Sequence, residues 1–244
     1  MVLIIDVGNT RIKAAVFENN TLLETFAFVS DHCQHQLPEI LKKYPKIKQL
    51  VHANVGNSIL EVIQELKLAI PVYRMSNQTK FPFRNAYTTP ATLGIDRMIL
   101  AAGAVLQFPG QNRLVIDAGT CITYEYISAD DVYLGGAISP GIEMRYKALN
   151  NYTAKLPLLE KKFPELPIGN STAESMHVGV VQGVLHEIEG TLAELEAQAE
   201  KFIIILTGGD AEFLAKRVKN TIFANSNFLL EALNKLYQYQ TQND

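Results

Sequence analysis

The chain repeats one short pattern, in which an apolar run ends in an acidic turn with a glycine and a second strand-like run follows. The first copy is Asp6-Val-Gly-Asn-Thr10 after residues 2–5, and the second is Asp117-Ala-Gly-Thr120 after residues 114–116. Short apolar runs closed by turn residues are typical of buried strands. Because this unit opens each half of the chain, the sequence predicts a mixed-sheet α/β fold. Two similar halves, residues 1–112 and 113–244, are expected to pack face to face around a cleft that carries both turns.

The order of the expected elements supports this doubling. In the first half we expect strands at residues 2–5, 12–17, 21–29 and 49–55, helices at 36–43, 58–68 and 96–107, and an ordered loop at 71–90. In the second half we expect strands at residues 113–116, 121–127, 132–137 and 202–206, joined by a proline-containing stretch at 138–171. The helices expected there are residues 174–201, one from Ala211, and one capped by Ser226 that runs to Tyr237.

The composition limits the classes of function. A chain of 244 residues with 48% apolar and 19% charged residues can bury a substantial core and is typical of a soluble globular protein. Its net charge of −3 disfavours a nucleic-acid partner, since duplex binding usually needs a basic face. Two cysteines, Cys33 and Cys121, are too few for a disulfide framework. The N-terminal apolar run ends at Asp6, too early for a signal peptide or membrane span, so we expect a cytoplasmic protein.

The first turn carries groups that can bind phosphate. It consists of Asp6, Val7, Gly8, Asn9, Thr10, Arg11, Ile12 and Lys13. Its glycine lets the backbone approach a ligand, its threonine hydroxyl donates a hydrogen bond, and its carboxylate can hold a cation. A plain hairpin turn is the competing interpretation, but the second copy at residues 117–120 favours a pair of polyphosphate-binding turns. The chain has neither a P-loop nor a dinucleotide-binding glycine pattern.

Two further glycine-containing segments are candidate binding elements. Thr207-Gly208-Gly209-Asp210 follows a predicted buried strand and precedes a helix, where adjacent glycines let a flat base or sugar lie against the backbone. A plain strand-to-helix turn explains this segment equally well. The segments 135–136 and 139–141, Gly-Gly and Ser-Pro-Gly, either line the cleft or only make turns.

Gly94-Ile95-Asp96-Arg97 begins the apolar helix of the first half. An aspartate at a helix N-terminus offsets the helix dipole by about 0.3–1 kcal/mol, which is the purely structural interpretation. In the functional interpretation Asp96 is a general base and Arg97 anchors an anionic substrate. His32-Cys33-Gln34-His35 is disfavoured as a metal site, because no second Cys/His pair has a matching spacing.

Taken in order, these motifs resemble the type III pantothenate kinases of the acetate and sugar kinase/Hsp70/actin superfamily. The matching segments are Asp6-x-Gly-Asn-Thr10, Gly94-x-Asp-Arg97, Asp117-x-Gly-Thr120, Gly135-Gly-x-Ile-x-Pro-Gly141 and Thr207-Gly-Gly209. The resemblance implies two ribonuclease-H-like, actin-like ATPase halves with an interdomain cleft. It also implies that ATP phosphorylates the primary hydroxyl of pantothenate, the first step of coenzyme A synthesis.

The resemblance further implies roles for single residues. ATP is expected at residues 6–13, at Thr120, and at Thr207, Gly208 and Gly209. Asp96 is expected to accept the proton, and Tyr87, Gly94, Ile95, Arg97 and Thr172 to surround pantothenate. Asp117 is expected to help hold a monovalent cation, K⁺ or NH₄⁺, and Mg²⁺ is expected with ATP. Members are homodimers with the substrate pocket at the subunit interface, and the helix at 174–201 is the candidate for part of that contact.

Two other functions remain open from the residues. A sugar kinase of the same superfamily would need several Asn, Asp, Glu and His side chains for the sugar hydroxyls. The segment 81–97 offers aromatics and arginine instead, which suit a short amide that bears a carboxylate. A nucleotide-binding regulator without catalysis would have no need of a base such as Asp96 beside an anchor such as Arg97.

Overall fold

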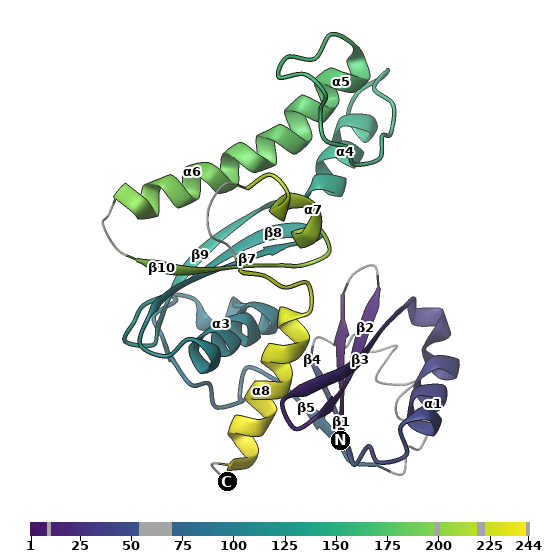
Figure 1. Cartoon of the computed structure of the whole chain (residues 1–244), viewed down its shortest axis with the longest axis vertical. Helices are drawn as coiled ribbons and strands as arrows, with labels where there is room; N and C mark the ends of the chain where they lie inside the picture. Colours follow the sequence, from purple (N-terminus) through teal and green to yellow (C-terminus); the bar gives the residue numbers. More distant parts are fainter. Residues whose placement is uncertain (9–10, 54–69, 198–200, 219–222, 243–244) are drawn as a thin grey trace. The chain divides into compact units, whose positions relative to one another are not determined.

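A computed structural model describes residues 1–8, 11–53, 70–197, 201–218 and 223–242 (Figure 1). The chain forms two compact units, Met1–Pro109 with Asn227–Asp244, and Gly110–Ser226. Each unit contains a mixed β-sheet with helices, which confirms the predicted α/β class. The division into ribonuclease-H-like halves at residues 112 and 113 stays a prediction, because the compact units are defined by packing alone.

The sheet of the first unit begins with the hairpin-connected strands predicted from the sequence. Its strand order is β3-β2-β1-β4-β5. The strands are β1 (Val2–Val7), β2 (Ile12–Glu18), β3 (Thr21–Phe28), β4 (Gln49–Ala53) and β5 (Val72–Arg74). β1, β2 and β3 pair antiparallel, whereas β4 runs parallel to β1 and β5 runs parallel to β4. The parallel pairing of β1 and β4 puts the end of β1, and so the first acidic turn, at the carboxyl edge of the parallel strands.

Helices cover both faces of this sheet and bury most residues of the central strands β1, β2 and β4. The α1 helix (Cys33–Lys43) packs its buried Leu37 and Ile40 against Leu3 and Ile5 of β1. The α8 helix (Phe228–Gln242) contacts β1, β2 and β4 and also packs against α3 (Ile95–Gln107). The α1 and α8 helices lie on opposite sides of the sheet, as Figure 1 shows. Each can pack against side chains of the same strands, because neighbouring strand residues point to opposite faces.

Small residues let α3 and α8 approach closely. A Cβ atom placed on Gly103 of α3 would lie 2.3 Å from the Cβ of Ala232 of α8. Asn234 of α8 donates a hydrogen bond of 2.9 Å to the carbonyl of Asn19 in the β2–β3 turn. The chain thus returns at its C-terminus to complete the first unit, which no local pattern in α8 indicates.

One histidine is buried in the sheet of the first unit. His52 of β4 is 1% exposed and lies in register between Ile5 of β1 and Arg74 of β5. Burial and the charge of Arg74 lower the pKa of His52 to about 4, from the 6.5 of an unperturbed imidazole. The imidazole is therefore neutral in the folded chain at neutral pH.

We expect His52 to make the fold sensitive to acid. Because the unfolded chain binds this proton near pH 6.5 and the folded chain only near pH 4, stability falls across that window, by at most about 3 kcal/mol. Urea unfolding measured from neutral pH down to pH 4 should show a shallower decline for His52→Leu than for the wild type. The matched control His35→Leu, at an exposed position of α1, should keep the wild-type slope. Equal slopes for the wild type and His52→Leu would contradict the assignment.

The segment predicted as an ordered loop at residues 71–90 is held by aromatic and backbone contacts. It contains β5, the short strand β6 (Arg84–Asn85), and a ring pair of Phe81 and Phe83 whose centroids are 5.4 Å apart. Gln240 of α8 donates a hydrogen bond of 2.5 Å to the carbonyl of Lys80. These contacts confirm that the segment is ordered and not a linker.

In the second unit the same strand pattern returns. Among the strands of this unit the order is β11-β10-β7-β8-β9. The strands are β7 (Asn112–Ala118), β8 (Cys121–Ile127), β9 (Val132–Pro140), β10 (Phe202–Thr207) and β11 (Phe223–Ala224). β7, β8 and β9 are antiparallel neighbours, and β10 runs parallel to β7 with Thr207 opposite Asp117. Two predicted binding turns therefore end neighbouring strands at one edge of this sheet.

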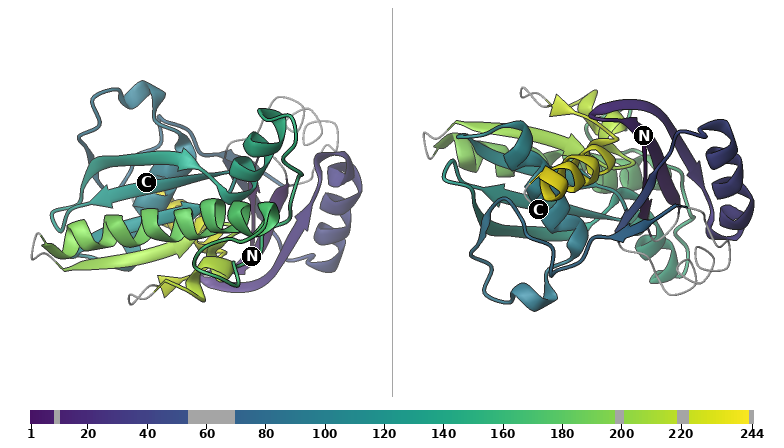
Figure 2. Two further views of the ribbon diagram at one scale, coloured as in Figure 1. Left: turned by 90° about the horizontal axis from the view of Figure 1, so that it is seen from above. Right: turned by 90° about the horizontal axis from the view of Figure 1, so that it is seen from below.

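Helices cover one face of the second sheet (Figure 2). They are α4 (Ile142–Asn151), α5 (Thr172–His177), a π-helical segment η3 (Val178–Gln182), α6 (Gly183–Ala197) and the short α7 (Ala211–Ala215). Ile116 of β7 and Tyr124 of β8 pack in one cluster with Val184 and Ile188 of α6. None of the described helices is long and apolar enough to cross a membrane.

Several sequence-based expectations need correction. The helix predicted over 174–201 is confirmed through Ala197, but it begins earlier, at Thr172, and contains the π-helical segment η3 between α5 and α6, where Val180 and Val181 are buried. The α4 helix lies in a stretch to which we assigned no helix. Ser226 does not cap α8, which begins at Phe228, and its hydroxyl donates to Glu212 instead. The helix expected at 58–68 lies outside the described residues.

Candidate active site

The first acidic turn joins two buried strands of the first unit. Asp6 and Val7 end β1, and Ile12 and Lys13 begin β2, with Asp6 opposite Lys13 in the register. The backbone N–H of Gly8 donates a hydrogen bond of 3.1 Å to the carbonyl of Arg11, which closes the turn. Asp6 is 9% exposed. Asn9 and Thr10, which we predict to contact ATP, lie outside the described residues.

The predicted substrate residues of the first unit lie together at the start of α3. Asp96 is in the first turn of the helix, and its Oδ1 accepts a hydrogen bond of 2.9 Å from the backbone N–H of Arg97. The guanidinium carbon of Arg97 is 5.7 Å from the ring centroid of Tyr87, a cation–π distance. Arg97 itself is 6% exposed. A carboxylate, a guanidinium and a phenol ring are therefore held in one cluster.

Gly94 provides the space for this carboxylate. It is the residue before α3, and its carbonyl accepts the first helical hydrogen bond, of 3.2 Å, from the N–H of Met98. A Cβ atom on Gly94 would lie 2.4 Å from Oδ1 of Asp96. Ile95 is buried beside them and anchors the helix start in the core. The first residue of the Gly-x-Asp-Arg motif is therefore a glycine because a side chain there would meet the carboxylate of Asp96.

In the second unit the turns at residues 117–120 and 207–210 are packed against each other. The backbone N–H of Asp210 donates a hydrogen bond of 2.9 Å to the carbonyl of Ala118. Gly208 has φ +95°, and a Cβ there would lie 2.3 Å from the carbonyl oxygen of Ala118 and 2.4 Å from Oδ1 of Asp117. Thr207 is buried and Thr120 is exposed. The structure therefore brings Asp117, Thr120 and residues 207–209 to one place, because β7 and β10 are parallel neighbours.

The Ser-Pro-Gly segment at residues 139–141, where β9 ends and the chain turns into α4, joins this group. The N–H of Gly141 donates a hydrogen bond of 3.1 Å to the carbonyl of Thr120. A Cβ on Gly141 would lie only 2.1 Å from the carbonyl oxygen of Gly119, so only glycine fits there. Gly135, in contrast, lies inside β9 beside a register shift at Tyr126. Residues 135–136 therefore lie within a strand, whereas residues 139–141 end that strand and touch the candidate site through Gly141.

A lysine that the sequence did not indicate also touches this group. Lys161 forms an ion pair with Asp210, and its ammonium lies 5.4 Å from the ring centroid of Phe213. Phe213 stacks on Phe163 with centroids 4.0 Å apart. The segment around residue 161 therefore folds over α7 and fixes the turn at residues 207–210. Lysine and phenylalanine in a proline-rich stretch carry no local signal for such a contact.

The positions of the remaining candidate residues say less about function. Thr172 is exposed at the first position of α5, where the Oγ of Ser171 caps the helix by accepting from the N–H of Glu174. Cys33 is buried in the core cluster between α1 and the first sheet. In the described part of the chain, no three His, Cys, Asp or Glu side chains gather in a set that could hold a metal ion.

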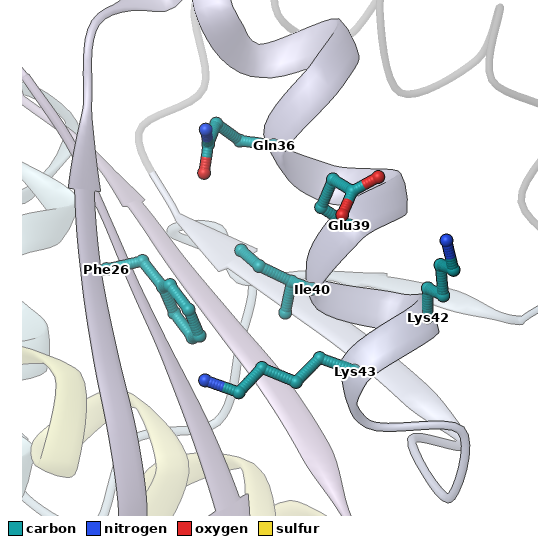
Figure 3. A pocket seen from close by; sticks show the side chains of 6 residues that line it. All are labelled: Phe26, Gln36, Glu39, Ile40, Lys42 and Lys43. Atoms are coloured by element: carbon teal, nitrogen blue, oxygen red, sulfur yellow. The ribbon is translucent and has the colours of Figure 1, made fainter.

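A surface groove lies elsewhere in the first unit. It has a volume of about 440 Å³ between β3 and α1, and its walls are Phe26, Gln36, Glu39, Ile40, Lys42 and Lys43 (Figure 3). None of these side chains is a predicted site residue. Lys43, at one end, is paired with Glu24 at 2.7 Å, so its charge is already satisfied within the chain.

Solved structures share this fold. A putative Baf family transcriptional activator from Campylobacter jejuni is 21% identical with a TM-score of 0.61, and the match covers 98% of this chain and 99% of that one. A putative N-acetylmannosamine kinase from Listeria monocytogenes is 13% identical with a TM-score of 0.53, and the match covers 100% and 99%. At these identities the likeness shows the fold alone. It defines the class as the actin-like ATPase and sugar-kinase fold.

The sequence comparisons are more specific. A profile of the type III pantothenate kinase family matches residues 2–194. A type III pantothenate kinase of Flavobacterium johnsoniae is 57% identical over 244 residues, which is 100% of both chains. The chain therefore belongs to the type III pantothenate kinase family, kinases that phosphorylate pantothenate in coenzyme A biosynthesis. The resemblance inferred from the motifs is confirmed, and a kinase that uses ATP implies a divalent metal ion such as Mg²⁺.

Proposed function

We propose that Asp96 is the general base in the transfer of the γ-phosphoryl group from ATP to the primary hydroxyl of pantothenate. The observation that carries this proposal is the cluster of Asp96, Arg97 and Tyr87 at the start of α3. The hydrogen bond from the N–H of Arg97 occupies one face of Oδ1 and orients the carboxylate. An oriented carboxylate can accept the hydroxyl proton as the new P–O bond forms.

Arg97 is proposed to anchor the carboxylate of pantothenate. Its guanidinium lies beside the ring of Tyr87, which limits the rotation of a long side chain before substrate arrives. Guanidinium groups bind carboxylates through paired, charge-assisted hydrogen bonds. Gly94 and Ile95 are proposed to line the pantothenate site beside Arg97. Thr172 is proposed to contact pantothenate as well, on the strength of its match to the family motif alone.

The nucleotide is proposed to bind at the glycine-containing turns. Residues 6–13 and Thr120 are proposed for the phosphates, and Thr207, Gly208 and Gly209 for the adenosine. Glycine backbones let a flat ring or a phosphate approach without side-chain obstruction. Positioning and charge neutralisation provide most of the rate enhancement in phosphoryl transfer, so these turns matter as much as the base.

Asp117 is proposed to help hold a monovalent cation, K⁺ or NH₄⁺. The chemistry of the donors fits such an ion, because Oδ1 of Asp117 and the carbonyl oxygen of Ala118 both crowd the space beside Gly208. When bound, the cation would neutralise negative charge on the phosphates. We also propose a cytoplasmic homodimer, with α5 and α6 as part of the contact between the two copies.

A coupled assay of ATP consumption tests this proposal. With Mg²⁺ present, we expect turnover that requires pantothenate and that rises on addition of K⁺ but not of Na⁺. Turnover independent of K⁺ would contradict the role given to Asp117. ATP binding without turnover of pantothenate would favour a nucleotide-dependent regulator.

A further inference from the structure

One carboxylate on α6 receives hydrogen bonds from three other elements of the second unit. Oε1 of Glu187 accepts from the hydroxyl of Tyr124 on β8 at 2.9 Å and from the hydroxyl of Ser139 on β9 at 2.5 Å. Oε2 forms an ion pair with the guanidinium of Arg145 on α4. None of these residues belongs to the motifs assigned to ATP or pantothenate.

This cluster is more constrained than an ordinary surface ion pair. The side chains of Arg145 and Glu187 are only 21% and 29% exposed. Burial opposes the charge on Glu187, but the hydrogen bonds from Ser139, Arg145 and Tyr124 outweigh it and keep the pKa of this carboxyl below its ordinary value. A carboxylate with three fixed donors and partial shielding holds its partners in one geometry.

Arg145 connects this carboxylate to the turn that follows β9. Its Nε donates a hydrogen bond of 2.8 Å to the carbonyl of Pro140, and its backbone N–H donates one of 3.0 Å to the carbonyl of Gly141. Ser139, in the same turn, donates to Glu187. Residues 139 and 140 pair with β8 in the sheet, and the turn into α4 is held in addition through its backbone by Arg145 and through the Ser139 side chain by Glu187.

The fixed turn lies against the proposed nucleotide-binding turn. Gly141 donates to the carbonyl of Thr120, and its Cα faces the carbonyl of Gly119 at a distance that leaves no room for a side chain. A movement of the 139–141 turn would therefore displace Gly119 or Thr120, or break the hydrogen bond from Gly141 to Thr120. Thr120 is exposed at the tip of the β7–β8 hairpin, which the N–H of Gly119 closes by donating a hydrogen bond of 2.9 Å to the carbonyl of Cys121.

We propose that Arg145 and Glu187 are positioning residues for ATP: they hold the 139–141 turn against Thr120 and so preorganise the nucleotide-binding turn. The proposal rests on the assignment of residues 117–120 to ATP. Neither side chain needs to touch the nucleotide. Preorganisation of this kind raises affinity by removing the cost of ordering the turn when the ligand binds.

Glu187→Gln is the informative substitution, because it keeps the shape of the side chain and removes the charge. We expect the KM for ATP to rise about fivefold while the KM for pantothenate stays within about twofold. Arg145→Met should have the same effect, and Arg145→Lys should recover part of the loss. The double variant Arg145→Met/Glu187→Gln should be no worse than the more damaging single variant, since both act through one contact.

A second ion pair, which lies on α4 like Arg145, serves as the matched control. Glu143 and Lys147 of α4 are paired at 2.7 Å with side chains 72% and 56% exposed, so this pair is a solvent-exposed one within a single helix. Glu143→Gln and Lys147→Met should leave both KM values unchanged. Thermal unfolding of every variant shows whether a change in KM merely follows a loss of stability.

The Kd for ATP, measured by calorimetry without pantothenate, separates this proposal from the proposed reaction. A weaker Kd in Glu187→Gln supports the positioning role even if the acceptor alcohol is not pantothenate. An unchanged Kd for ATP, or a rise in both KM values together, would overturn it. An equal weakening in the Glu143→Gln control would overturn it too.

Discussion

Replacing Asp96 with asparagine is expected to lower kcat by about 10²- to 10⁴-fold, the range typical of a lost general base. Asparagine keeps an oxygen at the Oδ1 position, so the hydrogen bond from the N–H of Arg97 can persist. The variant therefore removes the proton acceptor and preserves the shape of the helix start. Rapid-quench or coupled assays at saturating ATP and pantothenate measure the effect, and calorimetry should find the Kd for ATP within about twofold of the wild type.

Asp31→Asn is the control for this substitution. Asp31 is exposed in the short helix η1 (Ser30–His32) of the same unit, and it lies outside the predicted site. Its removal should leave kcat unchanged. Full activity in Asp96→Asn would remove Asp96 from the mechanism and leave the dipole effect at α3 as its only role.

Gly208→Ala is expected to destabilise the second unit by more than about 2 kcal/mol and to abolish ATP binding. The backbone of Gly208, at φ +95°, is in a region that side-chain-bearing residues rarely adopt. The added Cβ would also meet the carbonyl oxygen of Ala118 at 2.3 Å, which is a backbone atom and cannot rotate away. Relief of this clash must separate the two turns joined by the hydrogen bond between Asp210 and Ala118.

Gly209→Ala is the matched substitution one residue later. Gly209 is exposed, and among the described residues no atom lies within 4 Å of the position that its Cβ would take. Urea unfolding should therefore show a large loss of stability for Gly208→Ala and little change for Gly209→Ala. If both variants are equally stable, the close packing of the two turns is not a feature of the protein in solution.

Local sequence patterns were sufficient where the structure depends on neighbouring residues. The three hairpin-connected strands at the N-terminus are confirmed, because the apolar runs of β1 and β2, the alternating pattern of β3 and the Asn19–Asn20 turn are all local features. The strands that precede Asp117 and Thr207 are also confirmed as short apolar runs, although their parallel pairing is visible only in the structure. The identity of the family came from the order of several motifs and not from any one of them.

Contacts distant in sequence could not be predicted in this way. The return of α8 to α3 depends on the match of Gly103 with Ala232, residues that carry no signal until the two helices meet. The π segment between α5 and α6 preserves the apolar period closely enough to resemble one continuous helix. Arg145, Lys161 and Glu187 look like ordinary surface charges in the sequence, and only the tertiary structure shows what they hold.

The identity of the phosphorylated product tests the central claim most directly. Purified wild-type chain would be incubated with ATP, Mg²⁺ and K⁺ in an equimolar mixture of pantothenate, glucose and N-acetylmannosamine, and the products identified by mass spectrometry. We expect 4'-phosphopantothenate and no sugar phosphate. A phosphorylated sugar with unmodified pantothenate would contradict the assignment of Asp96, Arg97 and Tyr87 to a pantothenate site.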